Sequence, residues 1–142
     1  MIIIYHSKDL DGFCSAAVCK RKYPDATLIG YDYGQPFPWD KIDNAEPVII
    51  VDVSLPMEDM HRLLDHTGDL TWMDHHISAI EDCGNYPNWP DYAATRFTKV
   101  LQVGIAACEI AWNYLFPDEP MPLAVKLLGM YDTWRQNDPE HN

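Results

Sequence analysis

Short, mostly apolar runs alternate along the chain with longer segments in which apolar residues recur at helical spacing. The apolar runs predict strands at residues 1–5, 27–31, 47–53 and 70–73, with a further short strand at 97–101. Strands that are apolar on both faces are typical of parallel sheets covered by helices on both sides. We therefore predict an α/β fold with a mostly parallel sheet flanked by helices on both faces.

The helical spacing predicts helices at residues 12–23, 56–66, 104–116 and 122–131. The segment 56–66 gives the clearest pattern, because its large apolar residues fall on one face: Met57, Met60, Leu63 and Leu64. Residues 33–46 are expected to form a loop with a helical turn near Trp39, and residues 84–95 a second loop. Four large side chains near the C-terminus are assigned to the core: Trp112, Tyr114, Met130 and Trp134.

The chain has 142 residues, of which 47% are hydrophobic, and this is enough for one domain with a proper core. Ten basic residues face 22 acidic ones, which gives a net charge of -12. A surface of that sign repels a long nucleic acid backbone, so we expect a small ligand rather than a coated RNA or DNA. No apolar run approaches the roughly 20 residues of a membrane span, and we predict a cytoplasmic protein without membrane association.

The four cysteines show no paired spacing of the kind that zinc sites use. Three of them lie in apolar, helix-like segments, and the cysteines are interpreted as buried thiols in a reducing compartment: Cys14, Cys19, Cys83 and Cys108. A zinc site or disulfides are the less favoured interpretation.

Three of the predicted strands are followed at once by acidic residues and histidines. The first strand precedes His6, Asp9 and Asp11, the third ends at Asp52, and the fourth ends at Asp74, His75 and His76. The carboxyl ends of parallel strands meet at one edge of the sheet, where ligands of such folds bind. Carboxylate oxygens and neutral imidazoles are ligands that divalent cations prefer. The sequence therefore predicts a metal site at the carboxyl edge of the sheet.

Four short motifs resemble, in the same order, those of the DHH phosphoesterases. They read HSKDLDG at 6–12, VDVS at 51–54, DHH at 74–76 and YDTW at 131–134, so the resemblance covers roughly residues 1–135. This superfamily includes oligoribonucleases, single-strand DNA exonucleases, cyclic-dinucleotide phosphodiesterases and manganese pyrophosphatases. The spacing of the first motif is most similar to the oligoribonuclease-like branch.

The resemblance implies two manganese ions, with magnesium or cobalt as substitutes. One ion would be held by His6, Asp9 and Asp52, and the other by Asp11, Asp52, His75 and Asp132, so that Asp52 bridges the pair. The place of Asp132 in this set comes from the resemblance alone. The ions would activate a hydroxide for attack on phosphorus. His76 is implied as the hydrogen-bond donor to the phosphate or the acid for its leaving oxygen, and Asp74 as its catalytic support, which orients a histidine.

The implied function is hydrolysis of phosphodiester bonds in short oligonucleotides or small nucleotides, with a short oligonucleotide or dinucleotide as the bound partner. Family enzymes usually carry a second, C-terminal domain that grips the substrate with a glycine-rich segment. This sequence ends at Asn142 without such a segment. We therefore expect residues 1–142 to be a single catalytic domain, whose lid comes from a second copy of the chain or a partner domain.

Two other functions are kept open at this stage. The chain could be a metal- or nucleotide-binding module, or half of an enzyme, without catalysis of its own. It could also be a phosphatase like the haloacid dehalogenases, with Asp9 as nucleophile and Asp11 as acid and base. That fold places its nucleophile directly at the end of a strand. Here the segment Tyr5-His6-Ser7-Lys8 separates Asp9 from the apolar run at residues 1–4.

Several residues could contact a substrate without being part of the metal site. Lys8, Arg96 and Arg135 are candidates for phosphate or carboxylate contacts, although each is more often a solvated side chain. The aromatic residues of the loop 84–95 could stack on a nucleobase, but they more often pack such a loop onto its own domain: Tyr86, Trp89 and Tyr92.

Overall fold

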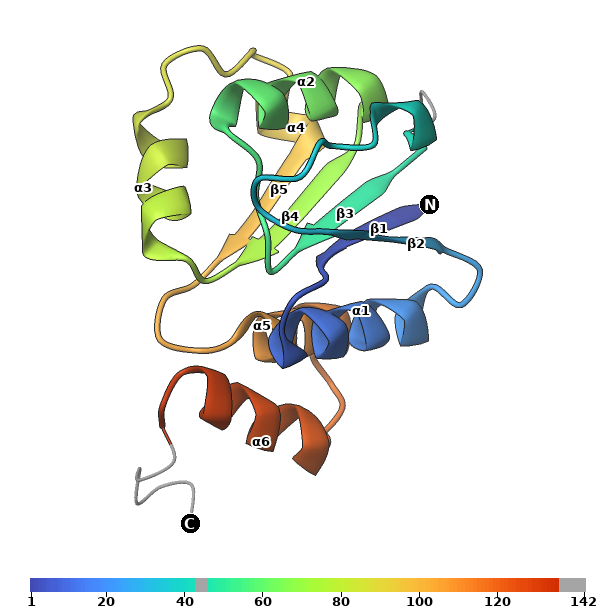
Figure 1. The fold of residues 1–142 in the computed structure, drawn as a ribbon, viewed down its shortest axis with the longest axis vertical. Coiled ribbons are helices and arrows are strands. Elements are labelled where there is room, and N and C mark those ends of the chain that lie inside the picture. The colour runs from blue at the N-terminus through green and yellow to red at the C-terminus, as the bar shows by residue number, and fades with distance from the viewer. Residues whose placement is uncertain (43–45, 136–142) are drawn as a thin grey trace.

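The computed structural model describes residues 1–42 and 46–135, and its centre is a parallel sheet of five strands (Figure 1). The strands are β1 (Ile2–His6), β2 (Thr27–Tyr31), β3 (Val48–Val51), β4 (Leu70–Asp74) and β5 (Phe97–Leu101). They are arranged in the order β2-β1-β3-β4-β5, and every neighbouring pair is parallel. The predicted α/β fold is confirmed.

Helices cover both faces of this sheet. They are α1 (Leu10–Lys22), α2 (Met57–Thr67), α3 (Ile77–Asn85), α4 (Ala93–Arg96), α5 (Ala107–Leu115) and α6 (Leu123–Asp132), with a 3₁₀ turn, η1, at Trp39–Lys41. In Figure 1, α1, α5 and α6 lie below the sheet, and α2 and α3 lie above and beside it. The chain therefore winds to both sides, as right-handed crossovers between parallel strands require.

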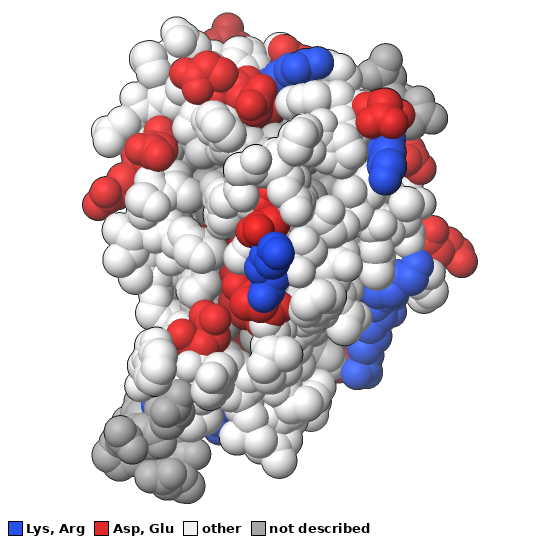
Figure 2. Space-filling model, viewed as in Figure 1, with Lys and Arg blue, Asp and Glu red and all other residues white. Residues whose placement is uncertain are grey.

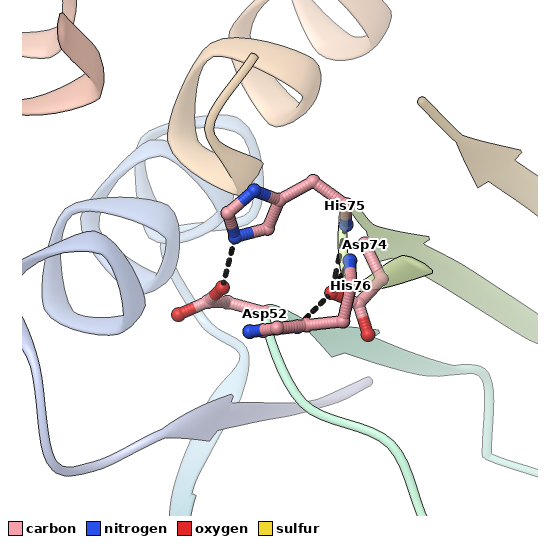
Figure 3. A group of neighbouring side chains, drawn as sticks. All are labelled: Asp52, Asp74, His75 and His76. Atoms are coloured by element: carbon pink, nitrogen blue, oxygen red, sulfur yellow. Dashed lines mark hydrogen bonds and ion pairs between the residues drawn. The ribbon is translucent and has the colours of Figure 1, made fainter. Parts of the chain in front are cut away.

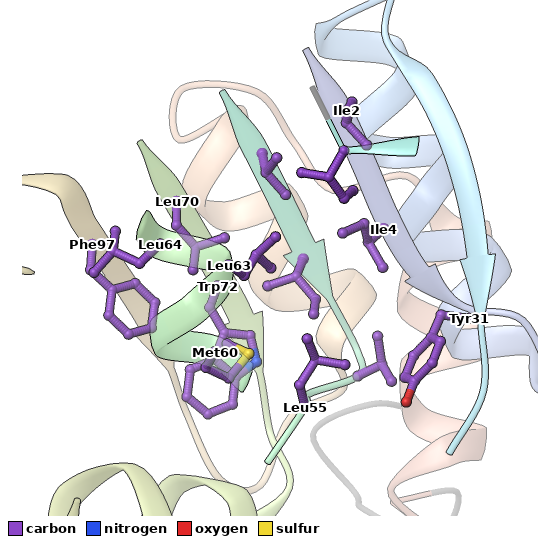
Figure 4. Close-up of a cluster of buried hydrophobic side chains, with 14 of the residues drawn as sticks. Ile2, Ile4, Tyr31, Leu55, Met60, Leu63, Leu64, Leu70, Trp72 and Phe97 are labelled. Carbon is purple, nitrogen blue, oxygen red and sulfur yellow. The ribbon is translucent and has the colours of Figure 1, made fainter. Parts of the chain in front are cut away.

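Alternate residues of each central strand supply the two halves of the core. On β1, Ile2 and Ile4 face α2, whereas Ile3 faces α1 and α5. Figure 4 shows the first half, in which Met60, Leu63 and Leu64 of α2 pack against the strands. β3 is buried along its whole length and its sequence, VIIV, is apolar throughout, which is the signal that predicts a parallel sheet. β4 is apolar except for Thr71, which is partly buried, and Asp74 at its end.

The strand order reverses beside β1, because the chain moves from β1 to one edge and then returns past it to β3. In open α/β sheets, loops diverge at this point and leave a crevice beyond the carboxyl ends of the strands. The ends of β1, β3 and β4 are direct neighbours there. The fold thus brings together the segments that carry the predicted metal ligands.

Several predicted boundaries shift, and the shifts have local causes. The first helix begins at Leu10 rather than 12, because the Asp9 side chain caps it by accepting from the backbone of Gly12. The third strand ends at Val51 rather than 53, since Asp52 adopts a left-handed conformation with φ 59°. The helix predicted from 104 begins at Ala107, after Gly104 turns the chain with φ 96°.

Other sequence predictions need larger corrections. The helix Ile77–Asn85 was not predicted, and part of the loop expected at 84–95 is helical at Ala93–Arg96. Trp112 and Met130 are buried as predicted, but Tyr114 is exposed on α5, and Trp134 is exposed beyond the end of α6. None of the described helices combines the length and apolar character that crossing a membrane requires.

The prediction of buried thiols is confirmed for three of the four cysteines. All four are unpaired, and three of them are buried: Cys19, Cys83 and Cys108. Cys14 is only partly buried. Burial raises the pKa of the Cys19 thiol to about 12, so this side chain behaves as a small apolar group within the core.

Candidate metal centre

Three neighbouring strands deliver the candidate ligands to one place. His6 is the last residue of β1, Asp52 follows β3, and Asp74 is the last residue of β4, directly before His75 and His76. Figure 3 shows Asp52 and the Asp74–His76 segment converging at the ends of their strands. The sequence prediction that these groups gather at the carboxyl edge is therefore confirmed as a matter of position.

Asp52 lies at the middle of the cluster and faces two sets of donors. Its Oδ2 atom is 3.7 Å from Nδ1 of His6, and its Oδ1 atom is 3.3 Å from Nε2 of His75. The side chain is 1% exposed, and its backbone has the positive φ that non-glycine residues rarely adopt. Strain of this kind is concentrated at functional sites, where surrounding structure enforces it.

The first set of donors consists of His6 and Asp9. Oδ2 of Asp9 lies 2.8 Å from Nδ1 of His6, while its other oxygen caps α1 at Gly12. On the far side of the imidazole, Nε2 of His6 donates to Asp32 at 2.9 Å. This bond fixes the tautomer and turns Nδ1 toward Asp9 and Asp52, as a carboxylate partner does for metal-binding histidines.

Gly12 is required for this arrangement. A Cβ atom at this position would lie 1.9 Å from the backbone oxygen of His6, so no larger residue fits between β1 and α1. The close approach brings the start of α1, with Asp9 and Asp11, against the end of the first strand.

The second set of donors consists of Asp11, His75 and Asp132. Nε2 of His75 lies 3.4 Å from Oδ2 of Asp11 and 3.6 Å from Oδ2 of Asp132. Asp132, which only the resemblance had indicated, is the last residue of α6 and lies beside His75.

Asp11 is held by the start of α5. Its two oxygens accept hydrogen bonds from the backbone of Ala107, at 2.9 Å, and of Cys108, at 2.8 Å. These donors belong to a helix N-terminus, where the helix dipole favours a negative charge.

Asp74 has a different role from the other carboxylates. It is completely buried, and Oδ1 accepts from the backbone of His75 at 2.8 Å and from Nδ1 of His76 at 2.6 Å. Its Oδ2 atom accepts from the indole of Trp72 at 3.2 Å. With these partners Asp74 orients His76 rather than facing a cation, which agrees with its predicted supporting role.

The electrostatics of the cluster are those of crowded, poorly solvated carboxylates. Burial, followed by the charges of Asp11 and Asp9, raises the pKa of Asp52 to about 10. Burial and Asp11 also raise the pKa of Asp132. The hydrogen bond that His76 donates to Asp74 raises the pKa of His76 above the usual value for histidine, because it stabilises the imidazolium.

The donor atoms fit a divalent cation. Nδ1 of His6 and Oδ2 of Asp52 are two of the three buried side-chain polar atoms, within the described residues, that lack an aligned hydrogen-bond partner. Three sets of side chains at this edge have ligand atoms close enough for a shared ion: His6, Asp9, Asp52; Asp11, His75, Asp132; and Asp52, Asp74, His75, His76. Figure 2 shows acidic atoms gathered in the middle of the face viewed there.

Sequence reasoning missed two residues beside the cluster. Asp32, the partner of His6, follows directly after β2, so the rule that identified the other strand ends would also have found it. Tyr33 follows it and lies against two histidines, with ring centroids 5.4 Å from His6 and 6.4 Å from His76.

The secondary candidates have mixed outcomes. Lys8 is exposed in the loop between β1 and α1, close to the cluster in sequence. Arg96 precedes β5 and is therefore at the opposite edge of the sheet, which rules out a phosphate clamp at this site. Arg135 pairs with the buried Glu109 rather than with a candidate ligand.

The aromatic residues of the loop 84–95 largely pack onto their own domain, as the more ordinary interpretation held. Tyr86 and Trp89 contact the core beside α2, and Tyr86 hydrogen-bonds His61 at 3.2 Å. Tyr92 bonds Asp65. None of these three side chains lines the crevice at the carboxyl edge.

We compared the chain with protein-family models, with curated proteins and with solved structures, and nothing in any of the three comparisons matches it. The class that the fold and cluster define is therefore an α/β protein with a candidate metal centre at the carboxyl edge of its sheet.

Proposed function

We propose that the protein is a manganese-dependent phosphoesterase that hydrolyses phosphodiester bonds in short oligonucleotides or small nucleotides. The observation that carries this proposal is the position of Asp52, whose two oxygens face separate sets of donors. A carboxylate placed in this way is what a pair of metal ions needs as a bridge. Histidine in both sets favours manganese or cobalt over magnesium, which prefers oxygen ligands and water.

His6, Asp9 and Asp52 would hold one ion, and Asp11, Asp52, His75 and Asp132 the other. When bound, two such ions lower the pKa of water and neutralise negative charge on a phosphoryl group. The protein holds the proposed ligands in place before an ion binds: Asp32 orients His6, and the start of α5 orients Asp11. Ligands held in this way need little rearrangement on binding.

His76 would supply the proton for the leaving oxygen. Asp74 binds its Nδ1 atom and raises its pKa, so the imidazolium persists to a higher pH than in an ordinary histidine. Nδ1 is occupied by Asp74, which leaves Nε2 to contact a substrate. A proton donor within the cluster supports catalysis over the alternative of a binding module, which has no use for one.

The phosphatase alternative with Asp9 as nucleophile receives less support. Both oxygens of Asp9 are engaged, one at the backbone of Gly12 and the other beside His6. An attacking carboxylate needs a free oxygen pointing toward the phosphorus. This arrangement favours Asp9 as a ligand and helix cap.

The remaining parts of the proposal concern the substrate and its setting. The net charge of -12 disfavours a long polyanion and favours a small one whose charge the metal ions offset. Four unpaired thiols are consistent with a reducing, cytoplasmic compartment. We also propose that a second copy of the chain or a partner domain covers the substrate.

One chromatographic assay tests the function. The protein is incubated with manganese and a mixture of pApA, a five-nucleotide RNA, cyclic di-AMP and pyrophosphate, and the products are resolved. We expect mononucleotides from pApA or the RNA, and none with the variants Asp52→Asn and His75→Ala. The variant Asp118→Asn, which changes an exposed acid, should retain the activity and controls for the purification.

Two outcomes would contradict the proposal. Equal product formation by wild type and Asp52→Asn would show that a contaminating nuclease is responsible. An absence of all products, together with a melting temperature that is the same in manganese and in chelator, would refute the proposal that this cluster binds metal.

A further inference from the structure

A pocket opens beside His76. It encloses about 340 Å³ and is lined by His76, Tyr33 and Ser54, and by the first residues of α3. This volume is within the range of small-molecule sites, about 300 to 1,000 Å³. A group leaving the metal centre past His76 would enter it.

A second pocket of about 550 Å³ continues from the first, since both are lined by Tyr33, Ser54 and Leu55. Its other walls include three aromatic side chains that belong to β2, the following loop and η1: Tyr31, Phe37 and Trp39. We call the two pockets together the Tyr33 groove. The groove thus runs from the proposed proton donor to an aromatic surface.

Tyr33 stands at the junction of the two parts. It is 47% exposed, which is unusual for an aromatic ring that also contacts two histidines of the site. Phe37 and Trp39 are partly covered already, because they pack against each other and the guanidinium of Arg62 lies 3.9 Å from the Trp39 ring centroid. Tyr33 therefore offers the accessible ring next to the metal centre.

The charge of the groove restricts what it can bind. Among the described residues that line it, none is Lys or Arg, whereas Asp59 and Asp82 are present. Away from His76, a second phosphate would face these two carboxylates and no Lys or Arg among the lining residues. A neutral ring that stacks on an aromatic side chain and hydrogen-bonds to Ser54 or Gln35 meets no such penalty.

We propose that the Tyr33 groove binds the nucleoside part of the substrate, with its base stacked on Tyr33. This inference rests on the proposed function in that the attached phosphate would lie at the metal centre. It specifies the substrate class as nucleotides rather than inorganic polyphosphates. It also moves the base-binding surface from the loop 84–95, which was the candidate in the sequence, to the loop that follows β2.

The test measures binding of adenosine, which has no phosphate and needs no metal. Saturation-transfer NMR, in chelator, should show transfer from the protein to the base protons of adenosine, and little to ribose 5-phosphate. Removing one stacking partner weakens base binding by roughly five- to a hundredfold. Tyr33→Ala and Tyr33→Leu should each weaken the apparent affinity for adenosine by that factor, whereas Tyr33→Phe, which keeps the ring, should preserve it.

Tyr114→Ala serves as the matched control, because this tyrosine is 45% exposed but lies on α5, on the other face of the sheet. It should bind adenosine like the wild type. Melting temperatures of all variants establish that each is folded, and Tyr33→Leu retains the test if Tyr33→Ala does not fold. Equal transfer to adenosine in wild type and Tyr33→Leu, or none in wild type, would overturn the inference.

The same proteins separate this inference from the proposed function. Asp52→Asn should abolish hydrolysis in manganese and leave adenosine binding intact, since Asp52 does not line the groove. Adenosine binding that depends on Tyr33 but is accompanied by no hydrolysis would refute the function alone. Hydrolysis of pApA with the same KM in wild type and Tyr33→Leu would refute the inference alone.

Discussion

Replacing Asp52 by asparagine should stabilise the metal-free protein at alkaline pH while removing its response to manganese. Asparagine has nearly the same shape as aspartate, and it tolerates the positive φ of this position better than most residues. It lacks the negative charge that burial and the neighbouring carboxylates oppose. The substitution therefore isolates the electrostatic cost of the carboxylate from its packing.

The size and sign of the effect follow from the raised pKa. In the folded protein the pKa of Asp52 is raised to about 10, whereas in the unfolded chain the carboxyl group titrates near its ordinary pKa of 3.8. The unfolded state thus binds fewer protons between these values, and the free energy of unfolding falls as pH rises by about 1.4 kcal/mol per pH unit. Between pH 5 and pH 8 this amounts to about 4 kcal/mol, a large part of the 5–15 kcal/mol that stabilises a typical domain.

Urea denaturation in chelator at several values between pH 5 and pH 8 measures this effect. The wild type should lose stability along the series, and Asp52→Asn should lose about 4 kcal/mol less, so that the variant is the more stable protein at pH 8. Asp118→Asn, at an exposed position, should follow the wild type. Parallel curves for wild type and Asp52→Asn would refute the reasoning, because they would mean that the buried carboxylate costs nothing.

Three further predictions concern the neighbours of Asp52. Gly12→Ala should lower the free energy of unfolding by about 1–3 kcal/mol in urea denaturation, because its Cβ would overlap the backbone of His6, whereas Gly84→Ala, whose Cβ meets nothing within 4 Å, should not. Asp32→Ala should weaken manganese binding about 10- to 100-fold in calorimetric titration, since His6 loses the partner that fixes its orientation. His76→Gln should lower kcat about 10²- to 10⁴-fold at unchanged manganese affinity. In the wild type, kcat should decline as the pH rises through the raised pKa of His76. Equal kcat values for wild type and His76→Gln would refute the role of His76 as proton donor.

The sequence was most informative where one physical rule applied repeatedly. Apolar runs without alternation predicted the parallel sheet, and polar residues directly after them predicted the cluster at its carboxyl edge. The rule needs only local sequence, because strand ends converge whatever the rest of the fold does. It located His6, Asp52 and His75, and applied once more after β2 it would have located Asp32.

What could not be predicted depends on contacts between distant segments. The backbone donors that hold Asp11 lie 96 and 97 positions further along the chain, so no local pattern reveals them. Asp132 reaches His75 only through the packing of α6. The exposure of Tyr114 has the same origin, since the side of a helix that is covered depends on the neighbours it meets. Trp134 lies beyond the end of α6, and its exposure likewise depends on how the chain packs after that helix.

The contrast between Asp11 and Asp52 indicates where the gain from a metal ion is concentrated. Both side chains are almost fully buried, but Asp11 accepts two backbone hydrogen bonds at a helix N-terminus, and its charge is already compensated. Oδ2 of Asp52 has no hydrogen-bond partner and faces other carboxylates from a strained backbone. The fold therefore stabilises the negative charge of Asp11 through hydrogen bonds, whereas it provides Oδ2 of Asp52 with no such donor among the described residues. A cation held by Asp52 and His6 would offset the cost of burying this carboxylate among other acids, so the free energies of metal binding and of folding should be coupled through Asp52.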